Sequence, residues 1–133
     1  MHAPNQTIQL DRMAATRIVS TPAALDGMAT SEDMIVLRVA PDEAFVFPPS
    51  DVTLDDAWAI VKTDSSLEGA WISAEESSDI LTRLCEWEIP SARPAFAQGM
   101  VAGIPTKLWL EADRTLLLVP APYVAEMEER ITH

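Results

Sequence analysis

The stretch that decides the fold is a strand followed at once by a capped helix, residues 69–86, GAWISAEESSDILTRLCE. Ser73 and Glu76 have the spacing of a capping box, in which each side chain accepts a hydrogen bond from a backbone amide at the start of the helix. The apolar residues that follow recur at helical spacing and form one stripe: Ile80, Leu81, Leu84 and Cys85. The sequence therefore predicts a strand at Gly69–Ile72 and a helix from Ala74 to Glu86.

Apolar segments on both sides of this stretch predict further strands, joined mostly by short turns. They lie near Thr16–Ser20 and at Met34–Val39, Ala44–Phe47, Trp58–Asp64, Ala95–Ala102 with an interruption at Gly99, Thr106–Leu110 and Thr115–Val119. A last helix is expected to begin near Pro122. Because short turns favour antiparallel pairing, we expect an α+β fold, a two-layer sandwich whose mostly antiparallel sheet is covered on one face by two helices.

The length of the chain, 133 residues, favours one domain. Residues 1–30 show no clear hydrophobic period, so we expect them to form a loosely ordered arm that can pack on another subunit. Residues 31–133 would then form a single α+β domain.

The charge of the chain argues against two classes of partner. It carries 21 acidic and 9 basic residues, a formal net charge of −12. A field of this sign repels phosphate backbones and anionic lipid headgroups, so we expect neither nucleic acid nor membrane as a partner. Residues 1–10 lack the basic start and apolar segment of a signal peptide, and the single cysteine fits a reducing compartment, so we expect a cytoplasmic protein.

The residues that most often carry catalysis are poorly placed. Both histidines, His2 and His133, lie at the ends of the chain, where a general base is hard to hold near its target. Cys85 falls on the apolar stripe of the predicted helix, which suits a core cysteine better than a nucleophile. No phosphate-binding glycine motif is present. We therefore predict no catalytic residue, no metal site and no cofactor, and expect that the chain is not an enzyme on its own.

Two weaker groups of residues are candidates for binding. Asp64 ends a predicted strand and precedes Ser65, at a place where a carboxylate either caps the turn or meets a ligand. The candidate ligand contacts are Asp64, Ser65 and Arg93. Trp87, Arg93 and Phe96 have the composition of a protein interface, although local packing explains Trp87 equally well. Trp58 and Trp71 are expected to pack in the core.

Two segments resemble motifs of a known family. Residues 39–46, VAPDEAFV, resemble the Gly-Pro-Asp-Glu-Trp hairpin of sarcosine oxidase gamma subunits, with Ala40 and Ala44 in place of the glycine and the tryptophan. Residues 59–66, AIVKTDSS, are similar to the strand that follows in that family and ends in an Asp-x-Ser turn. The order of elements from Met34 to Ile131 also resembles one lobe of the aminomethyltransferase (glycine-cleavage T-protein) fold.

The resemblance implies a role within an assembly. It suggests a non-catalytic accessory or assembly domain that supports a larger flavin- and folate-using oxidase, either as a homo-oligomer or as part of a larger protein complex. The alternative is a folate- or small-molecule-binding one-carbon protein that acts as an oligomer. Because the chain has the length of one lobe only, the resemblance implies that folate binds only at a site built by more than one chain.

Overall fold

The structure is a computed structural model that describes residues 8–132, and its chain divides into two compact units. Residues 8–13 and 66–132 belong to the first, which we call the five-stranded unit, and Ala14–Ser65 form the second, the four-stranded unit. All strand pairs are antiparallel, so the predicted α+β class is confirmed. The predicted single domain over residues 31–133 differs from this division, because the boundary falls between Ser65 and Ser66.

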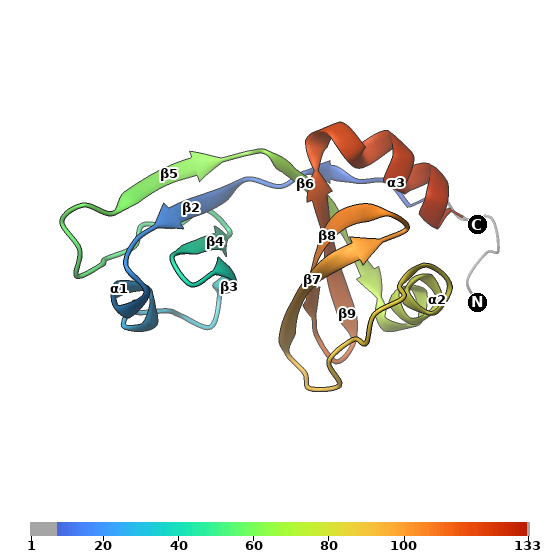
Figure 1. The fold of residues 1–133 in the computed structure, drawn as a ribbon, viewed down its shortest axis with the longest axis horizontal. Coiled ribbons are helices and arrows are strands. Elements are labelled where there is room, and N and C mark those ends of the chain that lie inside the picture. The colour runs from blue at the N-terminus through green and yellow to red at the C-terminus, as the bar shows by residue number, and fades with distance from the viewer. Residues whose placement is uncertain (1–7, 133) are drawn as a thin grey trace. The chain divides into compact units, whose positions relative to one another are not determined.

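The five-stranded unit contains one sheet with the strand order β1-β6-β9-β8-β7 (Figure 1). Its elements are β1 (Asp11–Arg12), β6 (Leu67–Ser73), α2 (Ala74–Leu84), β7 (Ala95–Val101), β8 (Ile104–Leu110), β9 (Arg114–Pro120), the 3-10 helix η1 (Ala121–Tyr123) and α3 (Val124–Ile131). Each predicted strand and helix of this region is present, with boundaries that differ by a few residues.

Helices α2 and α3 cover one face of this sheet, as the sequence predicts. Ile80 of α2 and Met127 of α3 are buried in the same apolar cluster as Leu108 and Leu117 of the central strands. The capping box is formed: the Glu76 amide donates to Ser73 Oγ and the Ser73 amide donates to Glu76 Oε1, both at 3.0 Å. The sequence pattern thus fixes where α2 begins and which of its faces is buried.

The hairpin of β7 and β8 depends on its glycines. Ala102 and Gly103 both have positive φ, 55° and 76°, which gives a two-residue turn whose twist matches that of the strands. The predicted interruption at Gly99 is wrong, because β7 runs through it and pairs with β8 over its full length. Pro105 lies inside β8 where that strand pairs with β7 alone, so its missing amide leaves the pairing with β9 intact.

The four-stranded unit has the strand order β3-β4-β2-β5 (Figure 1). Its elements are β2 (Ala15–Val19), α1 (Pro22–Asp26), β3 (Ile35–Ala40), β4 (Glu43–Phe47) and β5 (Ile60–Asp64). A small core forms where Ile18 of β2, Ala44 and Val46 of β4, and Leu25 of α1 are buried together. The hairpin of β3 and β4 is the one predicted from the sequence.

The predicted loosely ordered arm is wrong for residues 8–30; residues 1–7 lie outside the described part. Ile8 and Leu10 are buried in the five-stranded unit, and β2 is the central strand that pairs with both β4 and β5. Because β5 pairs with β2 rather than with β6, which belongs to the other sheet, the described strands form two sheets where one was predicted. In residues 8–132 no helix is long and apolar enough to cross a membrane.

Candidate functional site

Three of the exposed large apolar side chains, including the most exposed one, lie at the start of β5. Trp58 is 90% exposed, Ile60 49% and Val61 43%. β5 is an edge of the four-stranded sheet, with β2 on one side and no described strand on the other. We call this surface, Trp58 together with β5, the open edge. The sequence assigned Trp58 to a buried strand, and that prediction is wrong because β5 begins at Ile60.

A turn centred on Asp56 holds Trp58 outside the strand. Asp56 Oδ1 accepts a hydrogen bond from the Trp58 amide at 2.9 Å, and Oδ2 accepts one from the Ser20 hydroxyl at 2.7 Å. The Ala59 amide donates to the Asp56 carbonyl at 3.3 Å. The Ser20 hydroxyl and then the Trp58 amide lower the pKa of Asp56 below its ordinary value, since both bonds favour the carboxylate. The turn therefore fixes the backbone from which Trp58 projects.

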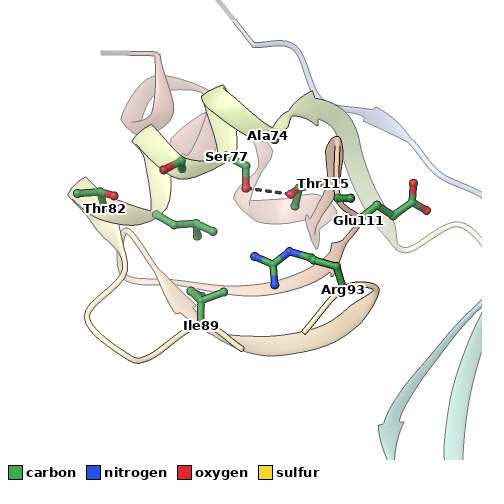
Figure 2. A pocket seen from close by; sticks show the side chains of 10 residues that line it. Ala74, Ser77, Thr82, Ile89, Arg93, Glu111 and Thr115 are labelled. Atoms are coloured by element: carbon green, nitrogen blue, oxygen red, sulfur yellow. Dashed lines mark hydrogen bonds between the residues drawn. The ribbon is translucent and has the colours of Figure 1, made fainter. Parts of the chain in front are cut away.

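The five-stranded unit contains a pocket of about 330 Å³ beside α2 (Figure 2). Its lining includes hydroxyl, apolar and charged side chains from α2, from the loop after α2, and from the turn between β8 and β9: Ser77, Ser78, Thr82, Ile89, Arg93 and Glu111. At its base the Thr115 hydroxyl donates to Ser77 Oγ at 2.9 Å, and both side chains are buried. The volume is at the lower end of the range for small-molecule sites, roughly 300–1,000 Å³.

Arg93 reaches into this pocket from the loop side. Its Nη1 donates to the carbonyls of Pro90 at 2.6 Å and Ala92 at 2.8 Å, which anchors the guanidinium. Figure 2 shows the guanidinium below the Ser77–Thr115 pair and the Glu111 carboxylate turned away from it.

Glu111 belongs to a separate polar group. Its carboxylate accepts hydrogen bonds from Arg114 Nε at 2.8 Å and from Trp109 Nε1 at 2.9 Å. The Arg114 bond, more than that of Trp109, holds the pKa of Glu111 below its usual value. The Arg114 guanidinium also lies 3.7 Å from the ring centre of Trp71, a cation–π contact. Trp71 is half buried, so its predicted place in the core holds in part.

The predicted ligand contacts fall in different units. Asp64 ends β5 and Ser65 follows it in the four-stranded unit, whereas Arg93 belongs to the five-stranded unit. Asp64 is half buried and Ser65 is exposed. Of the three, Arg93 alone lines the pocket described above, and a ligand role for each of them stays a prediction.

The predicted interface residues do not form one exposed patch. Trp87 is half buried against Gly99, and its Nε1 donates to the Met100 carbonyl at 2.8 Å. Phe96 is half buried and pairs across the sheet with Trp109, on the face opposite that of Gly99. The structure supports local packing for Trp87, and contact of these residues with a partner stays a prediction.

Groups suited to metal or nucleophilic chemistry are sparse in the described residues. No cluster of three His, Cys, Asp or Glu side chains in residues 8–132 has the geometry to hold a metal ion. Cys85 follows the end of α2, is half buried against the main core, and its Sγ lies 3.4 Å from the Trp87 carbonyl.

One signal for the open edge was present in the sequence. Asp56 precedes Trp58 by two residues, the spacing at which an aspartate side chain accepts a hydrogen bond from the backbone amide. Such a turn delays the start of a strand. Nothing in the local sequence marked the pocket, because its walls come from three separated segments.

The sequence matches no family model and no curated protein. Its fold is similar to a chain of the heterotetrameric sarcosine oxidase from Corynebacterium sp. U-96, solved in complex with pyrrole 2-carboxylate. The superposition has a TM-score of 0.71 at 12% sequence identity and covers 99% of this chain and 85% of that one. At this identity the likeness concerns the fold, and the chain therefore has a sarcosine oxidase gamma-like fold.

Proposed function

We propose that this chain is a non-catalytic accessory domain that assembles with a different protein chain, and that the open edge is its contact surface. The observation that carries the proposal is the 90% exposure of Trp58 beside β5, an edge strand that pairs with β2 on one side and with no described strand on the other. Tryptophan is the residue type most enriched at the energetic centres of protein interfaces.

An open edge strand is suited to binding an extended segment of a partner. Its free amides and carbonyls can form strand-to-strand hydrogen bonds, while the side chains on either side supply specificity. Proteins commonly protect such edges with lysine, proline, a bulge or a covering element. In β5 the protection is slight, since Lys62 is its only basic residue and Ile60 and Val61 are exposed.

The charge of the chain favours a different protein over a second copy. Each copy carries a formal net charge of −12 over the whole chain, so the fields of two copies would repel. A neutral or basic segment avoids this repulsion and would associate faster at low salt. A homodimer through two β5 edges is the competing arrangement.

Two further observations support an accessory role. The similar fold belongs to an enzyme described as heterotetrameric, in which several chains act together. Both histidines of this chain, His2 and His133, lie at the ends of the sequence, where a general base is hard to hold near its target. By this proposal catalytic groups reside on the partner chains.

Co-expression with the products of the adjacent genes, followed by native mass spectrometry, tests the proposal. We expect a complex of fixed stoichiometry that is lost in Trp58→Ser and in Ile60→Lys. Met100→Ser is the matched control, because it removes a 53% exposed apolar side chain from the other unit. A chain that remains monomeric with every candidate, or a complex that survives both open-edge variants, would contradict the proposal.

The pocket beside Arg93 favours a second candidate function, a folate- or small-molecule-binding one-carbon protein acting as an oligomer. A volume of about 330 Å³ suits a small molecule, so folate would need walls from a second chain. Thermal unfolding with tetrahydrofolate tests this candidate. At a concentration 100 times its dissociation constant, a ligand adds about 2.7 kcal/mol to the free energy of unfolding. No shift at the highest soluble concentration would count against folate.

A further inference from the structure

The pocket beside α2 combines one cation with hydroxyl and apolar walls, and it lies wholly within the five-stranded unit. It therefore shares no residue with the open edge. The question is which class of small molecule these walls would select.

Two hydrogen bonds hold the guanidinium of Arg93 in place, but they do not use all of its N–H donors. An arginine side chain has five N–H donors, and the two on Nη1 are directed at the Pro90 and Ala92 carbonyls. The three on Nε and Nη2 form no hydrogen bond or ion pair within residues 8–132. Nε and Nη2 together form the side-on fork that accepts both oxygens of a carboxylate. Anchoring by two carbonyls lowers the entropy lost when a ligand binds.

No carboxylate of the chain neutralises Arg93 in this pocket. Glu111 is the one acidic side chain that lines it, and this carboxylate is bonded to Arg114 and Trp109. Figure 2 shows it pointing away from the Arg93 guanidinium. Arg93 therefore has no acidic partner among the described residues, although the chain carries 21 acidic residues.

The other walls decide between kinds of anion. Leu81 and Ile89 offer apolar surface next to Arg93, and Ser78 and Thr82 of α2 offer hydroxyl groups. A single cation with Glu111 on the rim suits a monoanion better than a doubly charged phosphate. The apolar walls suit a short hydrocarbon body, which inorganic phosphate lacks.

We infer that this pocket binds a small organic monocarboxylate, with its carboxylate on the Nε–Nη2 fork of Arg93 and its hydrocarbon part against Leu81 and Ile89. Ser78 and Thr82 lie within the same pocket and can hydrogen-bond a polar substituent of the ligand. The site is a binding site, and no chemical step is assigned to it.

Titration of the full chain with 3-methylbutanoate, followed by amide NMR at constant ionic strength and neutral pH, tests the inference. We expect saturable shifts around Ser77, Ser78 and Arg93, with a dissociation constant on the order of 1 mM, as befits a ligand of few atoms. The uncharged 3-methylbutanamide should cause no such shifts, because it cannot form the charge-assisted bonds to Arg93. Inorganic phosphate should bind at least about tenfold more weakly, because it lacks the hydrocarbon part that packs against Leu81 and Ile89.

Arg93→Gln should weaken binding at least about tenfold, because it removes the charged fork. Arg83→Gln is the matched control: it removes the same charge from α2, where Arg83 pairs with Asp79 outside the pocket. Ser78→Leu fills the pocket without a change in charge and should also abolish binding, which covers the case that Arg93→Gln misfolds. Absent saturable shifts, equal loss in Arg83→Gln, or phosphate binding as tight as that of the carboxylate would each overturn the inference.

Discussion

Strand β7 lies at one edge of the five-stranded sheet, and β5 lies at one edge of the four-stranded sheet. One tryptophan lies near each strand, but the two indoles differ in how much they are exposed. At β7 the indole of Trp87 lies against Gly99, and its Nε1 donates to the Met100 carbonyl at 2.8 Å. At β5 the indole of Trp58 is 90% exposed, and the strand beside it is exposed over most of its length.

The edge of β7 is therefore partly covered by a side chain of the same chain, whereas the edge of β5 is exposed and can bind a partner. An unpaired edge is a risk for unwanted association, and natural proteins cover it unless it has a use. The chain uses a large aromatic side chain to cover β7, and at β5 it uses the Asp56 turn to hold another in solvent. The comparison predicts that Trp87 serves stability and that Trp58 serves binding.

Replacement of each tryptophan by alanine gives the largest expected contrast. Trp87→Ala should lower the free energy of unfolding by about 2–3 kcal/mol, less than a fully buried tryptophan would cost. Trp58→Ala should change it by less than about 0.5 kcal/mol, because an exposed side chain makes few contacts. Urea unfolding of the two variants measures both values. Similar losses of unfolding free energy in Trp87→Ala and Trp58→Ala would contradict the assignment of stability to Trp87 and of binding to Trp58.

The contact between Trp87 and β7 can be broken from the other side. In Gly99→Ala the new Cβ would lie 2.6 Å from Trp87 Cε2, so the indole must move, at a cost of about 1–2 kcal/mol. Gly27→Ala is the matched control, since the φ of Gly27 is −90° and the new Cβ would lie 3.6 Å from the Ala23 carbonyl oxygen, an ordinary contact distance. We expect that control to be neutral or stabilising by up to about 1 kcal/mol. A Gly99→Ala protein as stable as the control would show that the contact between the Trp87 indole and β7 does not stabilise the fold.

The turn that presents Trp58 should depend weakly on pH. The pKa of Asp56 is lowered from its ordinary value of 3.8, chiefly by the Ser20 hydroxyl. Its contribution to stability is therefore present above that ordinary value and is lost as the pH falls through the lower, folded value. Carboxyl NMR titration measures the shift, and Asp56→Asn, which cannot titrate, should lack this part of the acid response. An Asp56 pKa at or above 3.8 would contradict the turn geometry.

Local sequence signals predicted most of the five-stranded unit. The Ser73–Glu76 box and the stripe through Ile80 and Leu84 place α2 against the sheet, and alternating or continuous apolar runs mark β8 and β9. The strand predicted near Thr16–Ser20 is present as β2, but its place inside a sheet was not predicted, because its short apolar run has little signal by itself. Its burial comes from pairing with β4 and β5, which lie more than twenty residues away.

The sites were harder to predict than the strands, for a related reason. Trp58 follows polar residues and precedes a strand, so pattern alone assigned it to the core; the bond from its amide to Asp56 decides otherwise. The choice between packing and partner contact for Trp87 depended on Gly99, twelve residues later in the chain. Arg93 was predicted as a ligand contact without its pocket, because α2 and the β8–β9 turn supply the remaining walls.

Hydrogen exchange of the chain, free and in the complex obtained by co-expression, tests the central claim most directly. The account predicts that the amides of Ile60–Asp64 exchange more slowly in the complex and that Trp58 becomes shielded from fluorescence quenchers, whereas β7 and Trp87 stay as they are. Unchanged exchange in β5, together with protection confined to the five-stranded unit, would contradict it.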